Sequence, residues 1–213
     1  MSQLLKKAFI LSFITITYNI AEGLISIYFG MNDETLALFG FGVDSFVEVI
    51  SGIGIAHMVF RMKYSQIVCR DKFEITALRI TGISFYILTA GLVVGSIANI
   101  ILNVKPETTL IGIIVSSISV LTMYYLMKAK LVVGKELNSA AIIADANCTK
   151  TCFYLSFILL ASSLLFELTG IGFIDSVGSL GIAYFTFSEG REAFEKINSG
   201  NLSCSCDDEC HTK

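Results

Sequence analysis

Two pairs of potential metal ligands stand out in the sequence, and the members of each pair are four residues apart. Asp44 and Glu48 form the first pair, and Cys148 and Cys152 form the second. Side chains four residues apart on an α-helix lie on one face, about one turn from each other. Carboxylates and thiolates bind zinc and related ions, and two ligands from each of two helices can complete a tetrahedral site. The spacing therefore predicts a cation site shared by two helices.

The composition indicates where such helices lie. Of the 213 residues, 54% are hydrophobic and 15% are charged, whereas a soluble domain carries about 25% charged residues. This difference predicts a membrane protein in contact with lipid and excludes a soluble multidomain enzyme. The net charge of −3 provides no basic excess for binding phosphates, which argues against a nucleic-acid partner.

Six stretches are long and apolar enough to cross a bilayer, which takes about 20 residues each. They predict an all-α integral membrane protein with six transmembrane helices, at residues 8–30, 36–60, 75–102, 110–127, 137–168 and 171–187. The polar segments between them, including 61–74 and 128–136, are expected to be turns. The fifth and sixth helices are expected to meet at Thr169 and Gly170.

The distribution of basic residues predicts the orientation. Nearly all lysines and arginines near the span ends fall on one side, and Lys105 alone falls on the other. Because cytoplasmic loops carry the excess of positive charge, both termini are expected in the cytoplasm of a multi-pass cell-membrane protein. Residues 1–196 would form the transmembrane domain, and residues 197–213 a flexible cytoplasmic tail rich in cysteine.

Ionisable groups in mid-membrane are costly and are functional candidates by default. A rise of about 1.5 Å per residue places Asp44 and Glu48 at depths that overlap those of Cys148 and Cys152. Two acids on one helix face have few structural uses at that depth. Two cysteines four apart on an apolar helix, in contrast, are often no more than small buried hydrophobic residues.

Further polar residues accompany the two pairs. Asp145 precedes Cys148 by about one turn, where it would add a ligand or relay protons. Asn19 and Glu22 in the first span would line the cytoplasmic path, and Asp175 opens the sixth span as a further accessory candidate. Glu22 is equally suited to pair with Lys150.

Other charged residues have simpler expected roles. Lys150 is expected to pair with an acid such as Glu22 or to extend toward the membrane interface. Glu189 lies near the end of its span and is expected to be solvated, and His57 is expected to lie at the interface.

The tail carries a second group of potential ligands: Cys204, Cys206, Cys210 and His211, with three acids between them. These residues would wrap a soft cation. A flexible terminus with cysteines is also suited to lipidation. The carboxylates among the thiols have no role in lipidation and favour metal capture.

Four segments, 19–23, 40–48, 144–146 and 174–180, resemble the transmembrane domain of the cation diffusion facilitator family. The resemblance covers about residues 8–196. It implies six spans with both termini inside, a homodimer, and export of divalent metals, commonly zinc, in exchange for protons. The positions of the family's transport ligands correspond to Asp44 and Glu48 on the second span and to Cys148 and Cys152 on the fifth.

The chain departs from the family pattern in two respects. Cysteines stand where the family has His and Asp, which predicts a softer ion of the zinc, cadmium or mercury class. The cytoplasmic domain that normally follows in the family is expected to be missing, since residues 197–213 are too few to form it.

Two functions follow as hypotheses. The first is a metal-ion/proton antiporter, not an enzyme, whose partners are the metal cation and protons and which needs no cofactor beyond the transported metal. The alternative is a non-transporting membrane metal sensor or partner subunit that acts through the Cys-rich tail. An intramembrane metalloenzyme is disfavoured because no hydrolytic arrangement of His and nucleophile occurs in the spans.

Overall fold

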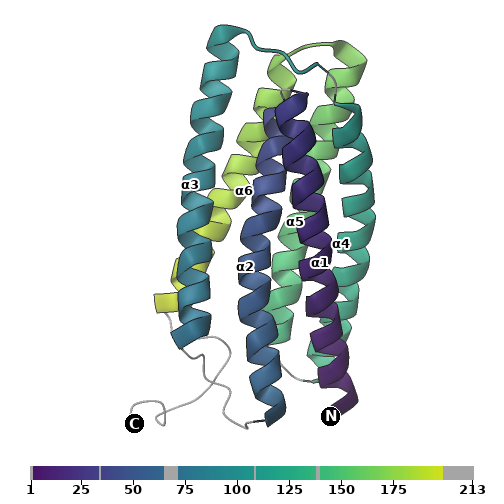
Figure 1. Ribbon diagram of the computed structural model, residues 1–213, viewed down its shortest axis with the longest axis vertical. Coiled ribbons are helices and arrows are strands. Elements are labelled where there is room, and N and C mark those ends of the chain that lie inside the picture. The colour runs from purple at the N-terminus through teal and green to yellow at the C-terminus, as the bar shows by residue number, and fades with distance from the viewer. Residues whose placement is uncertain (1, 34, 65–71, 108, 138–139, 199–213) are drawn as a thin grey trace.

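The computed structural model describes residues 2–33, 35–64, 72–107, 109–137 and 140–198. All regular structure in these ranges is helical (Figure 1), which confirms the predicted all-α class. The helices are α1 (Ser2–Asn32), α2 (Leu36–Tyr64), α3 (Lys72–Leu102), α4 (Leu110–Glu136), α5 (Ala140–Thr169) and α6 (Phe173–Asn198).

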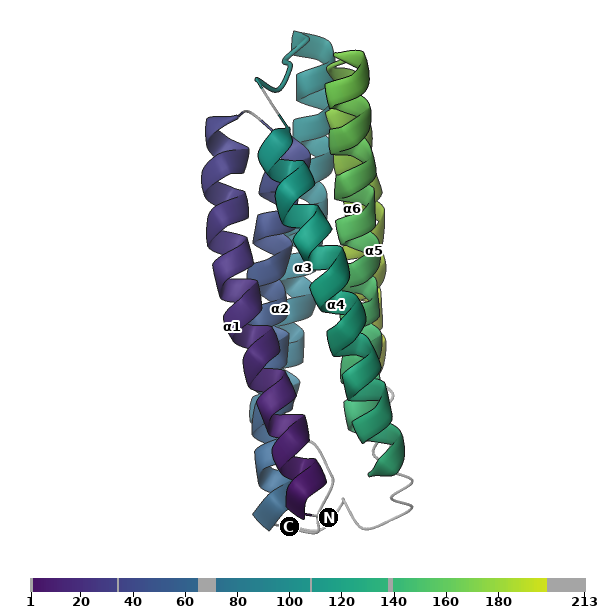
Figure 2. The ribbon, with the colours of Figure 1, turned by 90° about the vertical axis from the view of Figure 1, so that its right-hand side faces the viewer.

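Consecutive helices run in opposite directions and form an elongated bundle (Figures 1 and 2). The most extensive packing joins α1 to α2, α4 to α5, and α3 to α6. We call the end of the bundle at which α1 begins the N-terminal end. In Figure 1 it lies at the bottom, where α2 and α4 end and where α3 and α5 begin.

Five of the described helices, α1 to α5, contain segments long and apolar enough to cross a membrane. Each also exposes large apolar side chains, such as Phe13 on α1 and Ile87 on α3. Helix α6 is long but less apolar, because Asp175, Glu189 and several serines interrupt its hydrophobic residues. Helix α6 packs against α2, α3 and α5. Polar residues on these faces of α6 therefore contact other helices.

The helix boundaries correct part of the sequence interpretation. Segment 128–136, expected to be a turn, is helical because α4 continues to Glu136, and α2 and α3 take up parts of segment 61–74. The charges in these segments suggested loops, yet the helices extend beyond their apolar stretches. The predicted boundary between the last two helices is confirmed: α5 ends at Thr169, and Gly170 follows with φ of 66°.

Two carboxylates secure helix starts at the opposite end of the bundle. Asp175 accepts hydrogen bonds from the backbone N–H groups of Leu36 (2.9 Å) and Ala37 (3.3 Å) at the start of α2. Glu167 accepts one from the N–H of Thr109 (2.6 Å), directly before α4. The first N–H groups of a helix lack intrahelical partners, so both carboxylates act as caps supplied by another helix.

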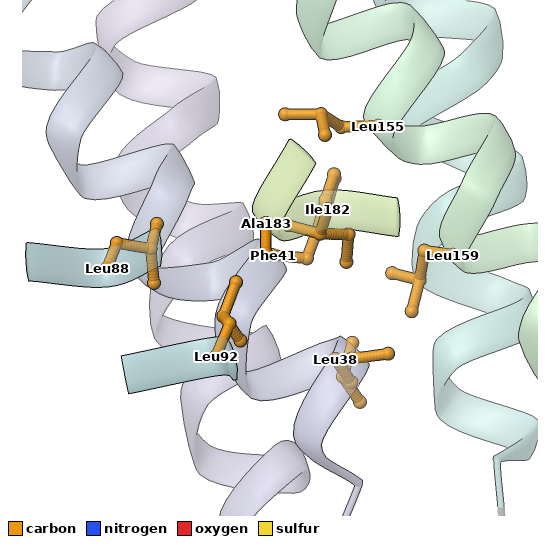
Figure 3. Packing of buried hydrophobic residues seen from close by; sticks show 9 residues of the cluster. Leu38, Phe41, Leu88, Leu92, Leu155, Leu159, Ile182 and Ala183 are labelled. Atoms are coloured by element: carbon orange, nitrogen blue, oxygen red, sulfur yellow. The ribbon is translucent and has the colours of Figure 1, made fainter. Parts of the chain in front are cut away.

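An apolar core packs between the helices of the bundle (Figure 3). Four helices contribute buried side chains: Leu38 and Phe41 from α2, Leu88 and Leu92 from α3, Leu155 and Leu159 from α5, and Ile182 and Ala183 from α6. These residues pack into one contiguous cluster. The core joins the helices that carry the two predicted ligand pairs.

Candidate cation site

The two predicted ligand pairs are in direct contact through one residue of each pair. The thiol of Cys152 on α5 donates a hydrogen bond to Oε1 of Glu48 on α2. Both residues lie beside the apolar core along their helices: Cys152 is about one turn from Leu155, and Glu48 is about two turns from Phe41. The packing of α2 against α5 therefore brings a carboxylate and a thiol together inside the bundle.

Asn19 on α1 fixes the second oxygen of this carboxylate. Its Nδ2 donates a hydrogen bond of 2.9 Å to Oε2 of Glu48. The side chain is 1% exposed, so α1 and α2 must be in place for the bond to form. Asn19 is thus a positioning residue that orients Glu48 toward Cys152.

A cavity of about 50 Å³ opens beside these three residues. A water molecule needs roughly 10–15 Å³ measured in this way, so the cavity has room for a small cation with attached water. All six helices line it. The lining residues are Ser12, Thr15, Asn19, Glu48, Gly52, Leu78, Thr81, Phe85, Lys130, Asp145, Cys148, Thr149, Cys152, Glu189 and Ala193.

Two buried oxygen atoms near the Glu48–Cys152 contact have no hydrogen-bond partner: Oδ1 of Asn19 and Oδ1 of Asp44. Both residues are almost fully buried, with 1% and 2% of their surface exposed. An unpaired buried acceptor is costly and calls for a ligand, an ion or an ordered water. Two such oxygens beside a thiol and a carboxylate suit a cation that binds oxygen and sulfur.

The four predicted ligands are near one another but do not converge on one point. Cys148 lines the same cavity as Glu48 and Cys152, whereas Asp44 lies one turn from Glu48, toward the apolar core. Within the described ranges, no three His, Cys, Asp or Glu side chains are close enough together to hold one metal ion. A four-ligand site requires side-chain rotation or helix movement from this arrangement.

Asp145 has a different partner from any considered in the sequence analysis. Its carboxylate forms an ion pair with Lys130 of α4, whose Nζ lies 3.0 Å from each of its oxygens. The same ammonium donates to the hydroxyl of Thr149 at 3.0 Å. Lys130 falls in polar segment 128–136, which was expected to be a turn, so no sequence pattern placed this residue inside the bundle.

Glu22 and Lys150 do not pair. Glu22 accepts hydrogen bonds from Tyr18 (2.9 Å) and Ser45 (3.1 Å) between α1 and α2. Lys150 is exposed, with its Nζ 5.7 Å from the ring centroid of Tyr154. The outward direction of Lys150 agrees with its predicted position away from the cysteines, and the expected ion pair with Glu22 is absent.

Glu189 is the acid that sequence analysis underestimated. It lines the cavity from α6 and accepts a hydrogen bond of 2.8 Å from the hydroxyl of Thr151 on α5. Its position near the end of an apolar stretch suggested a solvated residue. Only the packing of α6 against α3 and α5 reveals that this part of the helix faces the interior.

The remaining accessory candidates lie elsewhere. Asp175 caps α2 at the opposite end of the bundle from the cavity. The tail ligands Cys204, Cys206, Cys210 and His211 fall outside the described residues.

The cavity and the apolar core divide the bundle along its axis. On α3, the cavity residues Leu78, Thr81 and Phe85 precede the core residues Leu88 and Leu92. On α6, which runs in the opposite direction, the order is reversed. The cavity therefore lies toward the N-terminal end, and the apolar core closes the interior between it and the capped end.

Comparison with known proteins assigns no family: no family model matches the chain, and neither does any curated protein sequence.

Proposed function

We propose that the protein is a membrane transporter that exports a thiophilic divalent cation from the cytoplasm in exchange for protons. The observation that carries the proposal is the contact between Glu48 and Cys152, beside a cavity that all six helices of a membrane-length bundle line. A buried carboxylate and thiol at such a place have a clear use as cation ligands.

The hydrogen bond between the two residues supports exchange with protons. In the described arrangement the thiol of Cys152 donates its proton in a hydrogen bond to Oε1 of Glu48. A metal ion binds thiolate and carboxylate, so this proton must leave before the ion can bridge the two atoms. Metal and proton therefore exclude each other at the same position, which is the requirement for antiport.

The asymmetry of the bundle supports alternating access. The cavity lies toward the N-terminal end, which we assign to the cytoplasm because the lysine and arginine residues cluster there. The apolar core between the cavity and the capped end blocks passage in this arrangement. Release to the other side would require the helices around Phe41, Leu92 and Ile182 to separate, as helix bundles of transporters do around a central site.

The ligand chemistry favours a soft or borderline divalent ion. Two thiols and two carboxylates, from Cys148, Cys152, Asp44 and Glu48, rank cadmium, mercury and zinc above manganese and magnesium, which prefer oxygen ligands. Asn19 would hold Glu48 in position, and its unpaired oxygen is available to the ion or its water. As in the cation diffusion facilitators that the sequence resembles, we propose a homodimer.

The test is transport by the purified full chain in sealed proteoliposomes. We expect flux of cadmium and zinc into the lumen and slower flux of cobalt and manganese. Protons should leave the lumen as the metal enters, so the luminal pH should rise. Empty liposomes provide the baseline. Saturable metal binding without flux would instead support the membrane sensor that acts through the tail.

A further inference from the structure

Lys130 is an unusual residue in this cavity, because it is the one cation among the described lining residues that include Glu48, Asp145 and Glu189. Its side chain is 1% exposed. Its ammonium lies 3.0 Å from both oxygens of Asp145 and from the hydroxyl of Thr149. A buried ion pair is seldom justified by stability alone, since apolar residues of similar volume often serve as well or better.

The position of the ion pair links it to the proposed ligands. Asp145 and Thr149 lie on the same face of α5 as Cys148 and Cys152, because these residues recur at spacings of three and four. Asp145 is about one turn closer to the N-terminal end than Cys148 and about two turns closer than Cys152, on the side from which cytoplasmic metal would arrive. A free carboxylate at this place would act as a further ligand.

We propose that Lys130 determines the strength and selectivity of the cation site by keeping Asp145 out of it. The inference rests on the proposed function. With Asp145 neutralised by Lys130, the carboxylates left at the site are those of Asp44, Glu48 and Glu189. This limited negative charge binds a divalent ion but still allows its release.

Removing the ammonium of Lys130 should strengthen the binding of a divalent cation. Without Lys130, the cavity that Cys148 and Cys152 line gains one uncompensated negative charge on the buried side chain of Asp145. Because charges interact more strongly inside a protein than in water, a divalent ion should bind about tenfold more tightly or better. Tighter binding delays release, so the maximal transport rate should fall.

The experiment measures cadmium binding to the purified full chain, in a background in which the tail residues Cys204, Cys206 and Cys210 are serine. The thiolate-to-cadmium charge-transfer absorption reports binding at the remaining thiols. Lys130→Gln and Lys130→Met both remove the charge. Methionine keeps the long apolar part of the lysine side chain, so Lys130→Met serves as the second variant if Lys130→Gln folds poorly. Lys130→Arg retains the charge.

Lys128→Gln is the matched control. Lys128 is exposed on the same helix, with its Nζ 4.5 Å from the ring centroid of Tyr124. The substitution therefore removes the same charge outside the cavity. We expect the dissociation constant to fall about tenfold or more in Lys130→Gln and Lys130→Met, and to stay unchanged in Lys130→Arg and Lys128→Gln. The maximal cadmium flux should fall in the two neutral Lys130 variants alone.

The double variant Lys130→Gln/Asp145→Asn removes both charges together, and we expect its affinity to return to near that of the parent. Folded neutral variants that bind cadmium no more tightly than the parent would overturn the inference. So would a double variant that binds about tenfold more weakly, because Asp145 would then be a ligand in the native protein. A parent chain that binds no cadmium would contradict the proposed function itself.

Discussion

The thiol of Cys152 donates a hydrogen bond to the carboxylate of Glu48 inside the bundle, although 104 positions separate the two residues in the sequence. They come from helices that run in opposite directions, and Asn19 holds the carboxylate from a third helix. This hydrogen bond is the contact that a metal ion would replace.

Cadmium affinity should rise with pH. Binding requires thiolate and carboxylate, and each proton displaced contributes up to about tenfold in affinity per pH unit. Replacing Cys152 by Ser, which does not ionise in this range, should make the dependence shallower by one proton. Dissociation constants measured over a series of pH values give both slopes, and equal slopes would show that Cys152 does not lose its proton to the metal.

Removal of the ligand carboxylates should abolish transport without unfolding the protein. Asp44→Asn and Glu48→Gln keep the side-chain shape but remove the charge that a divalent ion requires at a buried site. Initial rates of cadmium uptake in proteoliposomes should fall to the level of empty liposomes for each variant. The control is Glu195→Gln, which removes an exposed acid paired with Arg191. Full uptake by both variants would exclude this site.

Asp175 should prove structural. Its carboxylate accepts two N–H groups at the start of α2, and the loss of a helix cap costs about 0.5–2 kcal/mol. Asp175→Ala should therefore lower the thermal stability in detergent, with a smaller loss for Asp175→Asn, while cadmium affinity is retained. Loss of affinity in the folded protein would instead assign Asp175 to the cation site.

Truncation from Leu202 onward should raise the metal concentration needed for half-maximal transport several-fold and leave the maximal rate nearly unchanged. On the proposed cytoplasmic side, the removed cysteines and His211 would otherwise raise the local metal concentration near the transporter, as a tethered ligand does. The measurement is cadmium uptake as a function of concentration. A well-expressed truncation without any flux would show that the tail is essential to translocation.

Helical periodicity and hydropathy were sufficient to predict six helices and the boundary at Thr169. They also paired Asp44 with Glu48 and Cys148 with Cys152, because a spacing of four defines one helix face whatever the tertiary structure. A comparison of depths even anticipated that α2 and α5 would meet near these residues. The close contact formed between Glu48 and Cys152, which the comparison of depths had placed farthest apart among the four residues.

The residues that were misplaced owe their positions to packing between distant segments. Lys130 lies in a polar segment whose sequence is typical of a loop. Its ammonium is nevertheless buried in the bundle, where it pairs with Asp145 of α5. Glu189 lies near the end of α6, where only contact with other helices turns it toward the cavity. Asp175 was expected to be an accessory residue of the site. Its role as a helix cap could not be predicted, because the N–H groups that it caps lie 138 and 139 positions away in the sequence.

The most direct test of the Glu48–Cys152 site is zinc X-ray absorption on the full chain in which Cys69, Cys204, Cys206 and Cys210 are serine. Only Cys148 and Cys152 then remain of the six cysteines. We predict sulfur ligands at about 2.3 Å together with oxygen ligands at about 2.0–2.2 Å, and the loss of one sulfur in Cys152→Ser. Bound zinc surrounded by oxygen or nitrogen alone, with both cysteines intact, would contradict the assignment of the cation to this contact.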